Sequence, residues 1–131
     1  MKIIILLAMI YCHIINDYLL QGILASMKQY KWWINHEGFN PKYNKDYIAA
    51  LVCHAFSWTF TMSIPILIYR FNQINYKWAF IFMIAIIINT IIHAIVDDLK
   101  ANKYKLNLIQ DQLLHMAQIG LTFLLVIGDI L

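Results

Sequence analysis

Histidine and aspartate recur together in this sequence at a spacing of four residues. An α-helix places residues four apart on the same face, so each pair presents an imidazole and a carboxylate side by side. Such side chains bind divalent metal ions or transfer protons. The three pairs are His13 with Asp17, His93 with Asp97, and Asp111 with His115. Their repeated spacing predicts a metal site or an acid–base site.

Further polar residues accompany these pairs. Gln21 and Lys100 extend the faces of the first two pairs by three or four residues, and Gln112 directly follows Asp111. We interpret these three residues as hydrogen-bond partners of the site or as contacts to a substrate. His54 is an isolated fourth histidine, and it suits either metal ligation or hydrogen-bonded packing between helices.

The segments that carry these residues are strongly apolar. The chain has 131 residues, of which 62% are hydrophobic and 13% charged, whereas about 25% are charged in an ordinary soluble domain. Each apolar stretch has about the 20 residues that a helix needs to cross a bilayer. The stretches cover about residues 3–24, 47–69, 78–99 and 107–128. We therefore predict an all-α integral membrane four-helix bundle that forms a single domain over residues 1–131.

The first stretch is expected to be a retained span, because it lacks the small-residue cleavage site of a signal peptide. The lysine distribution predicts the orientation of the spans. Seven lysines lie in the first and third loops: Lys28, Lys31, Lys42, Lys45, Lys100, Lys103 and Lys105. The other side has three basic residues, Lys2, Arg70 and Lys77. By the positive-inside rule, the first and third loops are cytoplasmic and both termini are outside.

Antiparallel spans bring the ionisable residues to one depth. The first and third spans carry them in their second halves, and the second and fourth spans carry them in their first halves. A carboxylate near the centre of a membrane helix costs about 2.5–3.5 kcal/mol, so three of them need partners. No basic residue is expected inside the membrane, because Lys100 lies at the edge. Imidazolium–carboxylate pairs are one solution.

A divalent metal ion is the better solution, because it neutralises several carboxylates and binds neutral imidazoles. Mixed nitrogen and oxygen ligands favour zinc, with manganese or iron as alternatives. The ligand set is larger than one tetrahedral site, so either one ion or two ions joined by an aspartate are expected. The predicted metal-site residues are His13, Asp17, His54, His93, Asp97, Asp111 and His115.

The motifs H-I-I-N-D-Y-L-L-Q, H-A-I-V-D-D-L-K and D-Q-L-L-H-M-A-Q, with a lone histidine in the second span, resemble those of a known family. This is a small bacterial and phage membrane family catalogued as domain of unknown function 3307. The resemblance extends over about residues 6–120 and implies that the seven residues named above are the metal-site positions. The pattern is also similar to membrane-embedded metal-dependent hydrolases, and it implies a bacterial or phage-encoded inner-membrane protein.

Three functions follow from these observations. The first is a metal-dependent hydrolase that acts on a phosphoester or lipid-linked substrate near the cytoplasmic interface. In it, an aspartate that does not bind metal serves as general base, the candidates being Asp17, Asp97 and Asp111. The second is a metal or proton transporter. The scarcity of polar residues in the outer halves of the spans argues against it, because Thr61 and Asn89 are the only candidates expected there. The third is a structural or holin-like membrane protein. The expected partner is the lipid bilayer, and nothing indicates nucleic acid.

Overall fold

The computed structural model describes residues 2–35 and 40–127, and within these ranges all regular structure is helical. The predicted all-α class is confirmed. The long helices are α1 (Lys2–Ile15), α4 (Asp46–Arg70), α5 (Tyr76–Ala101) and α6 (Leu108–Ile127). The short elements are the π-helix η1 (Asn16–Leu20), α2 (Leu24–Met27), α3 (Tyr30–Ile34), and the 3-10 helices η2 (Pro41–Tyr43) and η3 (Phe71–Gln73).

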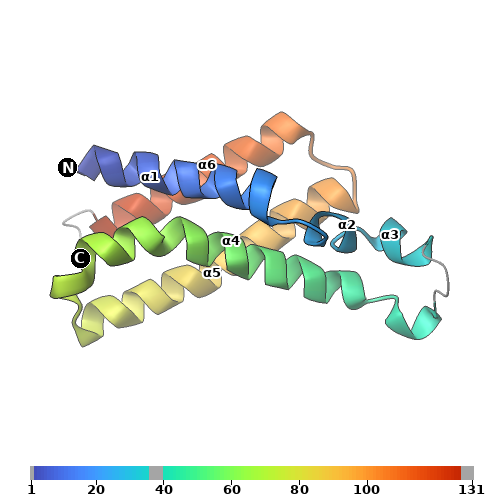
Figure 1. Ribbon diagram of the computed structural model, residues 1–131, viewed down its shortest axis with the longest axis horizontal. Coiled ribbons are helices and arrows are strands. Elements are labelled where there is room, and N and C mark those ends of the chain that lie inside the picture. Colours follow the sequence, from blue (N-terminus) through green and yellow to red (C-terminus); the bar gives the residue numbers. More distant parts are fainter. Residues whose placement is uncertain (1, 36–39, 128–131) are drawn as a thin grey trace.

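The four long helices pack against one another. Helix α4 contacts α1, α5 and α6, and α6 also contacts α1 and α5. Figure 1 shows these helices running lengthwise, with the start of α1 and the end of α6 at one end of the molecule and α2 and α3 at the other. Each predicted apolar stretch therefore corresponds to one long helix.

The first helical segment ends earlier than predicted. It continues from α1 through η1 to Leu20 and stops before Gly22, whereas the apolar pattern predicts helix to about residue 24. Gly22 has a backbone φ of +48°, a conformation that costs other residues about 1–2 kcal/mol. This glycine turns the chain out of the helix and into α2. The first loop is therefore anchored close to the ends of the other helices.

Three helical segments in the described ranges are long and apolar enough to cross a membrane. They are Lys2–Leu20, Asp46–Gln73 and Tyr76–Ala101. Helix α6 is not among them, because polar side chains such as Asp111, Gln112 and His115 lower its hydropathy. Membrane crossing by α6 therefore remains a prediction that rests on the sequence alone.

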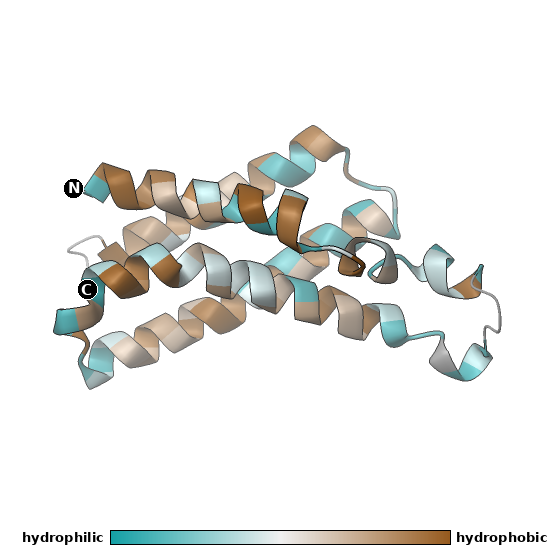
Figure 2. Cartoon of the chain, viewed as in Figure 1, coloured by the Kyte–Doolittle hydropathy of each residue, from teal (hydrophilic) through white to brown (hydrophobic). Residues whose placement is uncertain are grey.

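Large apolar side chains are exposed on all four long helices. They include Leu7 on α1, Phe56 on α4, Ile87 on α5, and Leu121 and Leu124 on α6. Within these helices, Figure 2 shows brown segments predominating, with teal segments recurring in the halves nearer α2. A soluble monomer rarely exposes so much contiguous apolar surface.

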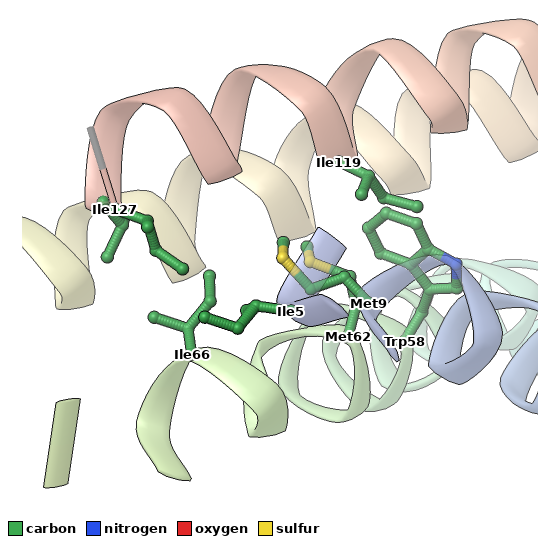
Figure 3. Packing of buried hydrophobic residues seen from close by; sticks show 8 residues of the cluster. Ile5, Met9, Trp58, Met62, Ile66, Ile119 and Ile127 are labelled. Carbon is green, nitrogen blue, oxygen red and sulfur yellow. The ribbon is translucent and has the colours of Figure 1, made fainter. Parts of the chain in front are cut away.

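The buried apolar cluster lies in the half of the molecule away from α2. Figure 3 shows its residues, contributed by α1, α4 and α6: Ile5, Met9, Trp58, Met62, Ile66, Ile119, Val126 and Ile127. In α1 this cluster precedes His13, whereas in α4 and α6 it follows His54 and His115. Trp58 lies at one end of the cluster, with its indole nitrogen on the side away from Ile5 and Ile127. Trp58 therefore separates the apolar core from a polar layer.

Candidate metal centre

The polar layer contains all seven predicted metal-site residues. The four imidazoles are buried, each with at most 1% of its surface exposed, and Asp97 and Asp111 are buried with them. Asp17 is nearly buried, because 8% of its side chain is exposed. The seven residues come from four parts of the chain: α1 with η1, α4, α5 and α6. The sequence spacing and the antiparallel packing of the helices account for this convergence.

The first group of potential ligands consists of Asp17, His54 and His93. Nε2 of His54 lies 3.4 Å from Oδ1 of Asp17 and 3.3 Å from Nε2 of His93. One ligand atom from each of the three residues lies within 4.8 Å of the other two. These atoms come from three helical segments, and the group could hold a metal ion.

The second group consists of His93, Asp97 and His115, and it also could hold a metal ion. Oδ1 of Asp97 lies 3.4 Å from Nε2 of His115 and 3.8 Å from Nε2 of His93. The two imidazole rings stack with their centroids 4.1 Å apart. His93 belongs to both groups, so the two sites are adjacent and depend on one imidazole.

Several potential ligand atoms lack hydrogen-bond partners. Nε2 of His115 lies 3.4 Å from Oδ1 of both Asp97 and Asp111, yet it forms a hydrogen bond with neither. Oδ1 of Asp17 and Oδ1 of Asp111 are likewise buried without a hydrogen-bond partner. Buried polar atoms are normally paired. Unpaired nitrogen and oxygen atoms that gather in one place match the ligand chemistry of a zinc-type ion.

A chain of hydrogen bonds orients His115. Nδ1 of His115 lies 3.3 Å from Oε1 of Gln118, and Nε2 of Gln118 donates to the backbone oxygen of Asn89 at 3.2 Å. Because the amide nitrogen of Gln118 is the donor, its oxygen accepts, and Nδ1 of His115 carries the proton. The lone pair then lies on Nε2, which faces the aspartates. Such a partner on the remote nitrogen is typical of a metal-binding histidine.

His13 lies outside both ligand groups. Its Nδ1 accepts a hydrogen bond from the indole N–H of Trp58 at 2.7 Å, and its Nε2 lies 3.0 Å from Oε1 of Gln112. Both ring nitrogens thus have protein partners. Nδ1 of His13 also lies 3.5 Å from Oδ2 of Asp17. In this structure His13 therefore presents no free nitrogen to an ion.

Trp58 is a site residue that the sequence pattern does not indicate. Besides its hydrogen bond to His13, its ring stacks on His93 with centroids 4.2 Å apart. It is fully buried. A tryptophan in an apolar span is usually interpreted as packing or as an interfacial anchor. The available signal was its spacing of four residues from His54, which places both on one face of α4.

Two lysines pair with the aspartates, although no basic partner inside the membrane was expected for them. Nζ of Lys28 lies 2.6 Å from Oδ2 of Asp97, and Nζ of Lys100 lies 2.6 Å from Oδ2 of Asp111. Asp17 has no lysine partner among the described residues. The long lysine side chains reach these carboxylates from the ends of the helices.

Asn102 fixes the position of Lys28. Its side-chain oxygen accepts a hydrogen bond from the backbone N–H of Tyr30 at 2.7 Å, and its side-chain nitrogen donates to the backbone oxygen of Lys28 at 3.1 Å. The same nitrogen donates to Oδ1 of Asp98 at 2.9 Å. The segment between α2 and α3 is therefore fastened to the end of α5, which brings Lys28 to Asp97.

The predicted accessory residues also lie at the centre. Nε2 of Gln112 donates to Oδ2 of Asp111 at 3.0 Å, while Oε1 contacts His13. The side chain of Gln21 donates to the backbone oxygen of Asp17 within the π-helical segment. Single turns of π-helix occur often at functional sites. Gln21, Gln112 and Lys100 thus each contact one aspartate of the cluster.

A small pocket of about 80 Å³ opens at the centre on the side of α2. Asp17, Asp97 and Asp111 line it together with Lys28 and Lys100. The carboxylates are therefore accessible from the end of the helices and not from the apolar core. A small polar molecule could reach the ligand groups by this route.

Comparison with known proteins finds no matching family, curated protein or solved structure. The resemblance to the family catalogued as domain of unknown function 3307 therefore stays a prediction.

Proposed function

We propose that this protein is a membrane-embedded metal-dependent hydrolase that acts on a phosphoester or lipid-linked substrate. The observation that carries the proposal is the pair of buried His/Asp groups that share His93, each with ligand atoms within 4.8 Å of one another. Four helical segments supply the ligands, and a pocket with both charges opens beside them. A purely structural bundle needs neither feature.

The proposed arrangement is a four-helix transmembrane bundle. Helix α6 supports it despite its lower hydropathy, because its polar side chains Asp111, His115 and Gln118 are buried whereas Leu121 and Leu124 are exposed. Such a helix presents apolar surface to lipid and polar groups to the protein interior. The lysine-rich loops lie at the end that carries the pocket. We therefore propose that this end faces the cytoplasm of a bacterial or phage-infected cell, with both termini outside.

Zinc is the proposed ion, with manganese or iron as alternatives, because the ligands combine imidazole nitrogens and carboxylate oxygens. One ion would be held by His93, Asp97 and His115, and Asp111 lies close to His115. A second ion would use Asp17 and His54. A bound divalent ion supplies positive charge to a phosphoryl group and lowers the pKa of a coordinated water to about 7.

Asp17 is the proposed general base when one ion is bound. Lys28 and Lys100 neutralise Asp97 and Asp111, whereas the carboxylate of Asp17 has no lysine partner among the described residues and lies beside imidazoles, with His54 at 3.4 Å and His13 at 3.5 Å. A carboxylate without an ammonium partner is the better proton acceptor. Asp17 also lines the pocket, so it reaches a water or substrate there.

The test is hydrolysis by the detergent-purified, zinc-loaded chain across a panel of phosphomonoesters, phosphodiesters and lipid phosphates. Asp17→Asn is expected to lower the rate by about 10²–10⁴-fold while zinc content is retained. Cys53→Ala is the matched control, because Cys53 is exposed and outside the cluster. Loss of zinc from Asp17→Asn would make Asp17 a ligand instead. Absence of cleavage across the panel would overturn the hydrolase proposal.

Transport is the second candidate, and one observation favours it. Polar groups extend beyond the centre, because Nδ2 of Asn89 donates to Oγ1 of Thr122 at 2.8 Å next to Gln118. The expectation that Thr61 and Asn89 are the only such groups is wrong. However, Met9, Met62 and Ile66 are fully buried in the apolar core on the same side of the centre as this network. Zinc flux into proteoliposomes that is lost in His93→Ala would reverse the ranking.

A further inference from the structure

We propose that Lys28 and Lys100 together bind the phosphoryl group of the substrate, and that they do so only when the metal centre is loaded. This inference rests on the proposed function and names the substrate class of the same site. It assigns a binding role to Lys28, which lies outside the long helices.

The geometry places both ammonium groups at one pocket. Lys28 and Lys100 line it from different parts of the chain, and each donates to one carboxylate oxygen at 2.6 Å. An ammonium group has three N–H donors, so each lysine retains donors beyond its aspartate partner. The side chain of Lys28 is 14% exposed and that of Lys100 is 35% exposed. The remaining donors can therefore bind an anion that enters the pocket.

Hydrogen bonds with Asn102 fix the backbone at Lys28. Asn102 binds the backbone on both sides of Gln29, through the oxygen of Lys28 and the N–H of Tyr30. A surface lysine without such support would lose considerable side-chain entropy on binding an anion. Here the backbone is already fixed and the ammonium group is already held by Asp97.

The charge of the pocket makes anion binding dependent on the metal. Three carboxylates and two ammonium groups line the pocket, so these five side chains together carry one net negative charge. One divalent ion reverses this to one net positive charge. An anion is therefore repelled from the metal-free protein and attracted to the loaded protein.

A phosphoryl group fits these donors better than a carboxylate does. Its three terminal oxygens can accept from both ammonium groups and still leave one oxygen directed at the ligand groups, whereas a carboxylate has only two oxygens. Phosphate oxygens are also strong acceptors of charge-assisted hydrogen bonds. The phosphoryl group can belong to a lipid headgroup or to a soluble phosphate, because the chemistry at the pocket is the same.

The experiment is equilibrium dialysis of radiolabelled inorganic phosphate against the full chain in detergent, both metal-free and zinc-loaded. We expect one phosphate per chain in the zinc-loaded protein and none in the metal-free protein. Lys28→Gln and Lys100→Gln should each weaken phosphate binding by about tenfold or more, since each removes a charged donor. The controls Lys42→Gln and Lys45→Gln, which change exposed lysines of the first loop, should stay within about twofold.

Lys28→Arg separates anion binding from folding, because it keeps the charge and should keep phosphate binding. Zinc per chain is measured for every variant, so that a variant that fails to fold is recognised by lost zinc. A second arm adds nanodiscs with or without phosphatidic acid. Displacement of labelled phosphate by phosphatidic acid, dependent on Lys28 and Lys100, assigns the phosphoryl group to a lipid. Without displacement, the ligand is a soluble phosphate.

Two results would overturn the inference while leaving the metal centre intact. One is phosphate binding of equal strength in the metal-free and zinc-loaded proteins. The other is wild-type phosphate binding by zinc-loaded Lys28→Gln and Lys100→Gln. If the wild-type chain binds no zinc, the proposed function itself fails, and the dialysis experiment identifies this separately.

Discussion

The indole N–H of Trp58 donates a hydrogen bond to Nδ1 of His13 at 2.7 Å, in the fully buried layer between the apolar core and the candidate metal centre. The same indole ring stacks on His93, the imidazole that belongs to both ligand groups. One apolar side chain from α4 thus orients a histidine of α1 and supports a histidine of α5. The candidate metal centre and the hydrophobic core are therefore a single packed structure.

Replacing Trp58 tests this relationship. Trp58→Phe keeps an aromatic ring against His93 but removes the donor to His13, whose Nδ1 is then buried without a partner. We expect the free energy of unfolding to fall by about 1–3 kcal/mol, measured by denaturant titration in detergent with zinc content followed in parallel. Phe56→Leu, at an exposed position of the same helix, is the control. Equal stability of Trp58→Phe and wild type would show that the hydrogen bond contributes nothing.

The ion pair between Lys28 and Asp97 predicts that the stability of a Lys28→Gln variant depends strongly on bound metal. Lys28→Gln leaves a buried carboxylate without its ammonium partner in the metal-free protein, which should lose about 3–5 kcal/mol of unfolding free energy. Zinc neutralises the same carboxylate, so it should raise the stability of Lys28→Gln more than that of wild type. Thermal unfolding with and without zinc measures both effects.

A double-mutant cycle with Asp97→Asn isolates this interaction. In the metal-free protein, Lys28→Gln combined with Asp97→Asn should be more stable than Lys28→Gln alone, because no charge remains unpaired. Strict additivity of the two substitutions would contradict the assignment of the pair.

Zinc affinity should depend on pH with a known sign. The proposed ligands bind metal as neutral imidazoles and carboxylates, so protons compete with zinc and the affinity falls as the pH is lowered from about 7.5 to 5.5. Calorimetry in buffers of different ionisation enthalpy measures the protons released on binding. Zinc affinity that is constant over this range would contradict imidazole ligation.

The local pattern in the sequence predicts much of the fold and of the site. The spacing of four in His13/Asp17, His93/Asp97 and Asp111/His115 depends only on helix geometry, and antiparallel packing of apolar helices brings the pairs to one depth. The boundary near Gly22 was missed because apolar residues continue beyond it, while the chain conformation changes at that glycine.

The contributions of Lys28 and Trp58 could not be predicted in this way. The contact of Lys28 with Asp97 requires the turn at Gly22 and the attachment of the first loop to Asn102, which are tertiary features without a periodic signal. Trp58 is apolar, and its role depends on which side chains surround its N–H group. The separation of His13 from the ligand groups likewise depends on the positions of Trp58 and Gln112.

The most direct test of the metal centre is elemental analysis of the detergent-purified full chain, with metal per chain measured for wild type and for His93→Ala. His93 belongs to both ligand groups, so its loss should remove most of the bound metal, while His13→Ala should retain at least part of it because His13 lies outside both groups. Tyr11→Phe, on the exposed face of α1, serves as the control. We expect one or two zinc, manganese or iron ions per wild-type chain. Wild-type protein without bound metal, or His93→Ala with undiminished metal, would contradict it.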